Sequence, residues 1–196
     1  EPVTRPPLTV SAFGMHLHWL GFAGYRARHE PGFWLPWRAQ YPELHSVPEG
    51  GGGLSGALGC VTLKEQVDAQ LHSLGWSDYH GSWLACGTGT TMAGFGLAEA
   101  GAHTVYGPLE VAEDHGVAPQ VESILREAGR VDAGYELIDA SRGGFAKVDP
   151  GLLAFIEQTE QASGVPWEPL YTGKALLALK EQSGSGKFFS GTRLIF

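Results

Sequence analysis

The sequence predicts an α/β protein with an open, largely parallel twisted sheet and helices on both faces. Short apolar stretches at residues 82–86, 102–109 and 135–138 have the length and pattern of strands. Stretches with helical spacing lie between them, and the connecting loops are short. Because parallel strands need crossover connections, which helices usually supply, this alternation is typical of a parallel sheet. The chain contains no internal repeat.

The first quarter of the chain is expected to contain two strands and a broken helix. Residues 15–20 alternate in polarity and predict a strand with His16 and His18 on one face. Residues 22–40 are mostly helical in pattern, with prolines that interrupt them, and residues 44–47 predict a second short strand. Two histidines at this spacing can ligate a metal ion, but no third ligand is apparent nearby, so no metal site is predicted.

The rest of the chain supplies further elements. A helix is expected over residues 54–74, after four glycines at residues 50–53. Those glycines fit either a close backbone approach to a ligand or a flexible turn, and both interpretations stay open. Asp149-Pro150 is a good helix start, and that helix should run to about residue 162. Also expected are a helix in the second half of residues 112–128, an apolar helix at residues 175–179 and a strand at residues 192–196.

Composition argues against several classes of protein. The chain has a formal net charge of −8 and no run of lysines or arginines, which argues against nucleic acid or an anionic membrane as partner. No apolar stretch reaches membrane-spanning length, and no signal peptide is present. The only cysteines, Cys60 and Cys86, stand in apolar contexts that favour reduced thiols. We therefore expect a cytoplasmic protein.

Both ends of the sequence are unusual for a complete gene product. Residues 1–14 form a proline-rich lead without an initiator methionine, and residues 192–196 have the pattern of a strand cut off before its following loop. We therefore expect a lead or linker over residues 1–14, one α/β domain over residues 15–196, and a longer parent chain. A chain of 196 residues is long enough for one domain with a sizeable core.

A glycine-rich loop is the part of the sequence that most directly suggests chemistry. It consists of Gly87, Thr88, Gly89, Thr90 and Thr91 and separates a predicted strand from a predicted helix. First-turn amides lack intrahelical acceptors and carry partial positive charge, so such a loop can bind an anion. The glycines allow close approach, and the threonines add hydroxyl donors. A tight turn that binds nothing is the alternative, and these residues leave it open.

The loop lacks residues that two common nucleotide-binding motifs require, and this limits the class of ligand it can bind. A P-loop needs a lysine at its end, and none follows Gly94. The dinucleotide fingerprint needs a third glycine where Met92 stands, although Glu110 lies about one strand–helix–strand unit downstream. The loop therefore suits a small phosphate monoester, and a nicotinamide-dependent oxidoreductase remains as the weaker alternative.

Three motifs together resemble a known enzyme family. They are Pro48-Glu49-Gly50-Gly51, the loop at residues 87–91, and Tyr171-Thr172-Gly173-Lys174. In this order they are similar to the pyridoxal-phosphate enzymes of the tryptophan-synthase-β fold type, in the branch of D-cysteine desulfhydrase and 1-aminocyclopropane-1-carboxylate deaminase. The likeness runs over about residues 15–196, with parts of the family's chain missing.

The resemblance implies pyridoxal 5′-phosphate as cofactor, a small amino acid as substrate and a homodimer as assembly. The loop Gly87, Thr88, Gly89, Thr90 and Thr91, where the family has Gly-Ser-Gly-Gly-Thr, would hold the cofactor phosphate. Tyr171 matches a family tyrosine that stands beside the substrate and helps with proton transfer. The cyclopropane deaminases carry glutamate where this chain has Thr172. The resemblance therefore leans toward desulfhydrase-like α,β-elimination, which releases ammonia and a 2-oxo acid.

The sequence also departs from the family. Thr90 replaces a glycine of the phosphate loop, and Phe145 stands where the family has a second tyrosine. The family's Schiff-base lysine would lie N-terminal to the residues present. The lysines of this chain are Lys64, Lys147, Lys174, Lys180 and Lys187, and none has that lysine's context. Whether the chain is an enzyme therefore stays open, and a catalytically silent relative that keeps the anion site is the alternative.

Overall fold

The computed structural model describes residues 12–112, 115–130 and 134–196. The chain divides into two compact units, residues 1–46 and residues 47–196. Within the described ranges, no helix combines the length and the apolar character that crossing a membrane requires.

The smaller unit is built from short helices. These are α2 (Gly21–Arg26), η1 (Ala27–His29) and α3 (Leu35–Gln40), as expected for a broken helix. The strand predicted at residues 15–20 is wrong, because these residues have no regular secondary structure. The His18 ring instead packs edge-on against Trp37 with ring centroids 4.9 Å apart, and its Nε2 lies 2.9 Å from the Tyr41 hydroxyl. The described part of this unit offers no strand to pair with the segment, so its alternation serves aromatic packing.

The strand predicted at residues 44–47 is also wrong. Residue 44 is a bend, and residues 45–47 have no regular secondary structure. The hydroxyl of Ser46 accepts a hydrogen bond from the Arg38 guanidinium at 3.3 Å. A side-chain contact to α3 therefore takes the place of a strand ladder here.

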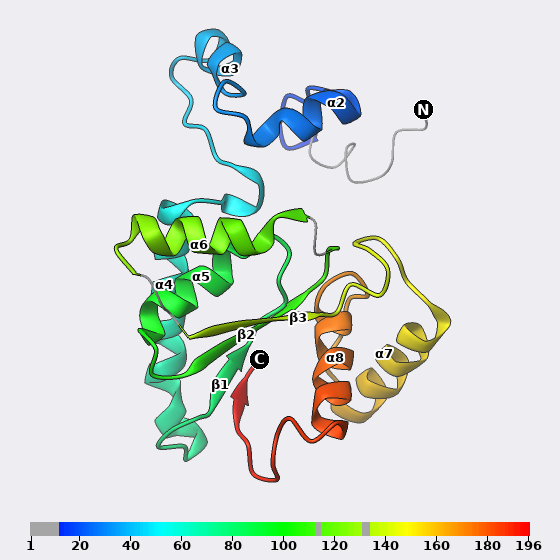
Figure 1. Cartoon of the computed structure of the whole chain (residues 1–196). Coiled ribbons are helices and arrows are strands. Elements are labelled where there is room, and N and C mark those ends of the chain that lie inside the picture. The colour runs from blue at the N-terminus through cyan, green and yellow to red at the C-terminus, as the bar shows by residue number, and fades with distance from the viewer. Residues whose placement is uncertain (1–11, 113–114, 131–133) are drawn as a thin grey trace. The chain divides into compact units, whose positions relative to one another are not determined.

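The larger unit contains a parallel sheet of four strands in the order β3-β2-β1-β4 (Figure 1). The strands are β1 (Gly81–Trp83), β2 (Thr104–Leu109), β3 (Tyr135–Asp139) and β4 (Leu194–Ile195). Gly81 is in register with Thr104 of β2 and with Leu194 of β4. The predicted parallel α/β fold is confirmed, although β1 and β4 are shorter than the apolar stretches suggest.

Helices cover both faces of this sheet (Figure 1). They are η2 (Glu49–Gly51), α4 (Leu54–Leu71), η3 (His72–Leu74), α5 (Thr90–Glu99), α6 (Val117–Glu127), α7 (Pro150–Ser163) and α8 (Thr172–Gly184). One core joins Ala57 of α4, Met92 of α5 and Val121 of α6 to the sheet. The other is built around Trp83, whose indole N–H donates to the carbonyl of Ala175 in α8 at 2.8 Å. The sheet is thus buried on both faces, as a parallel sheet requires.

Two helices begin where the sequence places them. Asp149 caps α7, because its carboxylate accepts the amide of Leu152 at 2.9 Å, and Pro150 occupies the first turn. The helix α6 occupies the second half of residues 112–128, as predicted. Its buried stripe consists of Val117, Val121, Ile124 and Leu125.

The helices α4 and α5 approach each other closely at a glycine. A Cβ atom on Gly94 would lie 2.6 Å from Cys60 Cβ and closer still to the carbonyl oxygen of Ala57. Only glycine therefore allows this contact, which draws the start of α4 toward α5.

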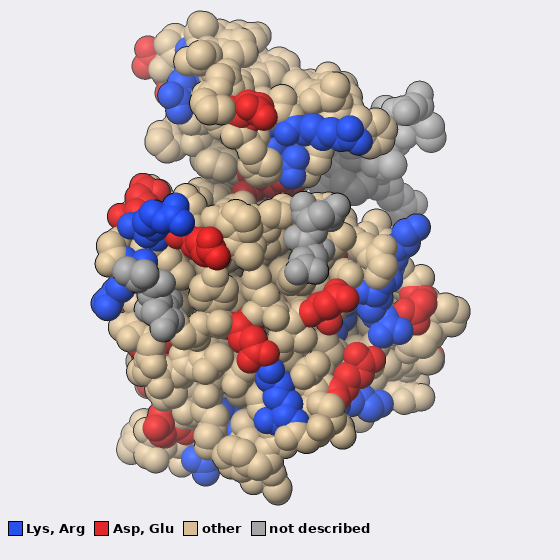
Figure 2. Space-filling view, in the orientation of Figure 1, with Lys and Arg blue, Asp and Glu red and all other residues tan. Residues whose placement is uncertain are grey.

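Both cysteines are free thiols, as predicted, with Cys86 buried and Cys60 partly buried. On the face seen in Figure 2, charges of both signs are interspersed.

Candidate functional site

The predicted anion loop lies between β1 and α5, at the edge of the sheet where the strands end. Beyond β1 the chain stays beside β2: the Cys86 amide donates to the Pro108 carbonyl at 2.9 Å, and the Cys86 carbonyl accepts the Glu110 amide at 3.1 Å. Gly89 then turns the chain into α5 with a φ of +83°. No described side chain caps α5. The Gly89 amide is directed at the Cys86 thiol, and no described carboxylate takes up the first-turn amides that follow, which have no intrahelical acceptors.

The loop threonines differ in exposure. The hydroxyl oxygens of Thr88 and Thr90 lie 3.2 Å apart. Thr90 is buried, Thr88 is partly buried and Thr91 is exposed. A hydroxyl rotates freely about its C–O bond, so each of the paired groups can turn its O–H toward a bound anion. The structure thus brings Thr88 and Thr90 together at the start of α5 and leaves Thr91 on the surface.

The four glycines at residues 50–53 pass next to this loop. A Cβ atom on Gly50 would lie 2.6 Å from Thr88 Cγ2 and closer still to Thr88 Oγ1. Gly50 also has a φ of +64°, which other residues rarely adopt. At this position, therefore, glycine serves a close approach, and the approach is to the anion loop.

Tyr171 immediately precedes α8, and its ring packs on Gly87. A Cβ atom on Gly87 would lie 2.9 Å from Tyr171 Cε1 and 3.6 Å from the hydroxyl oxygen. The structure therefore brings the predicted proton-transfer residue to the predicted phosphate loop. Burial raises the pKa of this phenol, and the carboxylates of Glu168, Glu49 and Glu110 raise it further. The phenol keeps its proton at neutral pH and can donate it in a hydrogen bond.

Glu168 fixes the start of α8 and, with it, Tyr171. Its carboxylate accepts hydrogen bonds from the amides of Leu170 at 2.7 Å, Tyr171 at 2.5 Å and Thr172 at 2.6 Å. The carboxylate thereby occupies the positive end of the helix dipole. Sequence reasoning missed Glu168, although an acidic residue just before a helix is a recognised start signal.

Lys174 holds the segment that carries Phe145. Its side chain is buried, and its ammonium donates to the carbonyls of Ser141 at 3.0 Å, Gly144 at 2.9 Å and Phe145 at 3.0 Å. The Phe145 ring in turn packs edge-on against Tyr171, with ring centroids 5.2 Å apart. All three N–H donors of Lys174 are used, so in this structure it is a structural cation that shapes the surroundings of Tyr171.

Glu110, considered in the sequence only for the nicotinamide alternative, acts electrostatically on Tyr171. It directly follows β2 and is 0% exposed, and neither carboxyl oxygen has a hydrogen-bond partner among the described residues. Burial raises its pKa to about 9, and the charge of Lys174 acts in the opposite direction. The carboxyl is therefore protonated at neutral pH. A carboxyl directly after an apolar strand is the signal that could have identified it, since ligands bind at this end of parallel strands.

This donor set fits a phosphate group. The loop offers hydroxyls and helix-start amides, the phenol of Tyr171 keeps its proton, and the buried acid Glu110, whose amide binds the residue before the loop, is neutral. Donors of this kind suit a phosphate ester such as pyridoxal phosphate. Within the described ranges, no cluster of three or more histidine, cysteine, aspartate or glutamate side chains is arranged to hold a metal ion.

A second group of ionisable side chains lies at the opposite end of α5. The Glu99 carboxylate accepts the hydroxyl of Tyr79 and lies 3.4 Å from Lys64 Nζ and 2.7 Å from His103 Nδ1. Lys64 also pairs with Asp68 at 2.6 Å. Each of these side chains has a partner inside the group. The group therefore ties α4 and α5 to the segments before β1 and β2.

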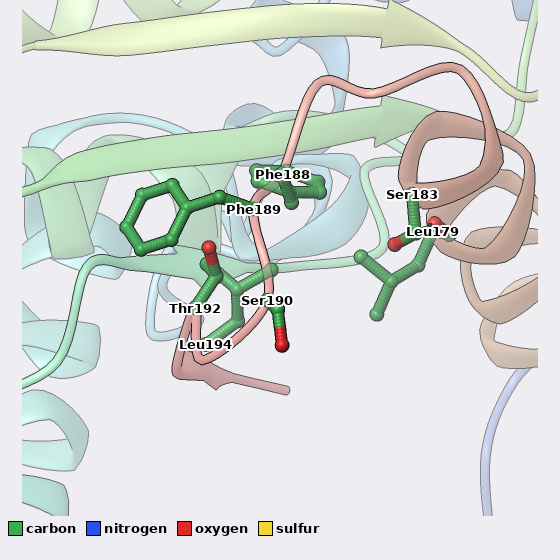
Figure 3. A pocket seen from close by; sticks show the side chains of 7 residues that line it. All are labelled: Leu179, Ser183, Phe188, Phe189, Ser190, Thr192 and Leu194. Atoms are coloured by element: carbon green, nitrogen blue, oxygen red, sulfur yellow. Dashed lines mark hydrogen bonds between the residues drawn. The ribbon is translucent and has the colours of Figure 1, made fainter.

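An open pocket of about 440 Å³ lies at the other end of α8 (Figure 3). Its walls are Leu179, Ser183, Phe188, Phe189, Ser190, Thr192 and Leu194. Leu194 begins β4, so the pocket lies where the strands start, and no charged side chain is among its walls. It is therefore separate from the anion loop and poorly suited to a phosphate.

Comparison with known proteins supports the resemblance drawn from the motifs. A Pyrococcus horikoshii protein, provisionally assigned as a 1-aminocyclopropane-1-carboxylate deaminase, is 24% identical over 158 residues, covering 76% of this chain and 47% of that protein. The crystal structure of a 1-aminocyclopropane-1-carboxylate deaminase homologue aligns with this chain with a TM-score of 0.73 and 21% sequence identity. The alignment covers 96% of this chain and 59% of the homologue. No family model matches the chain. The chain is thus similar to these proteins, has the fold of the second, and spans about half their length.

Proposed function

We propose that this chain forms the cofactor-binding part of a pyridoxal-phosphate-dependent lyase or deaminase that acts on a small amino acid. The similarity to a deaminase in sequence and to a deaminase homologue in fold supports this class. The observation that carries the proposal is the contact between Gly87 and Tyr171, where a side chain at position 87 would strike the ring. It places a phosphate loop and a proton-bearing phenol side by side, although 84 positions separate them in the sequence.

Each residue of the site has a distinct task in this proposal. The loop at residues 87–91 holds the phosphate through the first-turn amides of α5 and the hydroxyls of Thr88 and Thr90. When bound, the cofactor supplies an electron-withdrawing ring that makes the α-hydrogen of an amino acid acidic. Tyr171 holds a proton at its hydroxyl and delivers it to the substrate. Glu168 and Lys174 fix the backbone and the aromatic neighbour of that tyrosine.

The substrate proposed is one that a desulfhydrase-like α,β-elimination converts to ammonia and a 2-oxo acid. Position 172 supports this choice over the cyclopropane substrate. Thr172 stands where the cyclopropane deaminases carry a glutamate, and its hydroxyl lies 3.4 Å from the Glu168 carboxylate. Phe145, beside Tyr171, has no hydroxyl, so Tyr171 is the proton donor of this aromatic pair.

The test is a titration of the chain with pyridoxal 5′-phosphate, followed by absorbance and tryptophan fluorescence. Thr88→Val removes one hydroxyl and should weaken binding about tenfold, since a hydrogen bond to a charged group contributes about 1.5 kcal/mol. Thr62→Val, on the exposed surface of α4, is the matched control and should leave binding unchanged. Equal affinity for pyridoxal without its phosphate, or equal loss in both variants, would contradict the proposal.

A non-catalytic protein that keeps the anion site is the second candidate. It is favoured by the lysines of the chain, none of which has the context of the family's Schiff-base lysine. Borohydride reduction of the cofactor complex, followed by peptide mass spectrometry, separates the two candidates. A reduced adduct on one lysine favours the enzyme, and reversible binding without an adduct favours the non-catalytic protein.

A further inference from the structure

Glu110 is placed where it can sense an anion on the loop. Residues of β2 alternate between the two faces of the sheet: Val105 and Leu109 belong to the core under α5, and Tyr106 packs with the core under α8. Glu110 therefore points to the α8 face. Its amide donates to the carbonyl of Cys86, the residue just before the loop, at 3.1 Å.

The electrostatic influence of Glu110 reaches both sides of Gly87. Cys86 precedes Gly87, and the Tyr171 ring packs on Gly87. Burial is the main cause that raises the pKa of both the Cys86 thiol and the Tyr171 phenol, and the charge of Glu110 raises each of them further. The other ionisable groups that act on Glu110 are Lys174 of α8, Glu168 before α8 and Asp139 at the end of β3. Of these groups only Lys174 is a cation, and three carbonyls already bind it.

The buried carboxyl of Glu110 is not stabilised by hydrogen bonds from the described residues. Both carboxyl oxygens lie inside the protein without a partner in the described ranges. Burying an ionised carboxylate without partners costs much free energy of hydration, whereas burying a neutral carboxyl costs much less. The group thus has a strong reason to keep its proton, and any further negative charge nearby strengthens that reason.

We propose that Glu110 is a proton-holding residue of the anion loop: binding an anion at residues 87–91 and ionising Glu110 exclude each other. The inference deepens the proposed function, on which it rests only in taking the natural anion to be a cofactor phosphate. A bound anion raises the pKa of Glu110 above its value in the free protein. By linkage, the loop binds anions fully below the free pKa of Glu110, and affinity falls as the pH rises through it.

The experiment measures anion affinity by equilibrium dialysis from pH 6.5 to pH 10. Sulfate is the first probe, because it does not titrate in this range, and pyridoxine 5′-phosphate, which lacks the aldehyde, is the second. In the unchanged chain, affinity for both should fall about tenfold or more between pH 8 and pH 10. Glu110→Gln mimics the neutral acid and should keep the neutral-pH affinity at every pH. Glu157→Gln, on an exposed position of α7, should behave as the unchanged chain.

The outcomes separate this inference from the proposed function. Binding of both probes without a fall, or the same fall in Glu110→Gln, overturns the inference and leaves the proposed function standing. A pH-dependent affinity for sulfate without affinity for pyridoxine 5′-phosphate overturns the proposed function and leaves the inference about Glu110 standing. No binding of either probe at any pH overturns both. If Glu110→Gln does not fold, infrared spectra decide: in the unchanged chain sulfate should shift the titration of the buried carboxyl to higher pH, and an unshifted titration overturns the inference.

Discussion

Two helix starts lie beside each other at the edge of this sheet, and they differ in what occupies them. The start of α8 is filled by the Glu168 carboxylate, which accepts three consecutive amides. At the start of α5 the N-cap residue is Gly89, no described carboxylate takes up the first-turn amides, and the hydroxyls of Thr88 and Thr90 lie next to them. Both ends carry the same partial positive charge. The difference is what the proposed function requires: one helix start is filled by an anion of the protein itself, and the other is left for the proposed phosphate.

The two starts also depend on each other. Gly87, in the loop before α5, contacts the ring of Tyr171. The amide of Tyr171 in turn donates to the Glu168 carboxylate at the start of α8. A well-fixed α8 is therefore a condition for the geometry of the loop before α5. Glu110, buried at the end of β2, adds a carboxyl whose charge acts on the Tyr171 phenol.

The largest effect that we expect concerns Glu110 and the stability of the fold. Its pKa in the folded protein is about 9, well above the usual range of a glutamate. The native state therefore holds a proton that the unfolded chain releases near pH 4 to 5. Stability from this group is complete at low pH and is lost as the pH rises toward 9, at about 1.4 kcal/mol for each pH unit between the two pKa values.

Urea unfolding of the unchanged chain and of Glu110→Gln at pH 5, 7 and 9 measures this effect. The difference between the two free energies of unfolding should grow in favour of Glu110→Gln as the pH rises. Glu157→Gln corrects for the removal of one acidic charge. Parallel pH profiles of the unchanged chain and Glu110→Gln would show that Glu110 ionises normally.

The next effect concerns the filled helix start. Glu168→Ala removes the acceptor of three amides and should lower the free energy of unfolding by about 2 kcal/mol, at the upper end of helix-cap losses. It should also open the start of α8, so that sulfate protects the variant from unfolding more than it protects the unchanged chain. Glu157→Ala is the control at an exposed helical position. A variant of unchanged stability would mean that α8 does not need this carboxylate.

The smallest effect on stability is expected when the open start is given its own anion. Thr88→Asp places a carboxylate beside the first turn of α5 and should stabilise the chain by about 0.5 kcal/mol through the helix dipole. The same change should abolish binding of pyridoxal 5′-phosphate, because the new charge repels the phosphate. Thr88→Asn, which is similar in shape but neutral, should retain most of the binding. Calorimetry on the two variants distinguishes charge from shape, and equal affinities would argue against phosphate at this loop.

Local sequence patterns were reliable where a single segment contains the whole signal. Asp149-Pro150 predicted the capped start of α7, and the loop at residues 87–91 lies between a strand and a helix as expected. They failed at residues 15–20, where alternation predicted a strand, because a strand also needs a partner that the pattern does not supply. The use of the glycines at residues 50–53 stayed undecided for the same reason: their neighbour, Thr88, lies far along the chain.

From residue 54 onward the sequence by itself determined the order of strands and helices, and it also determined the parallel fold and the motifs that resemble a family of pyridoxal-phosphate enzymes. These depend on the periodicity and turn chemistry of short segments, which neighbouring residues encode. Only the tertiary structure decided that Tyr171 touches Gly87, that Glu168 fills one helix start while another stays uncapped, and that Glu110 is buried without a partner. Burial and charge coupling depend on distances across the sheet, and residues far apart in sequence set those distances.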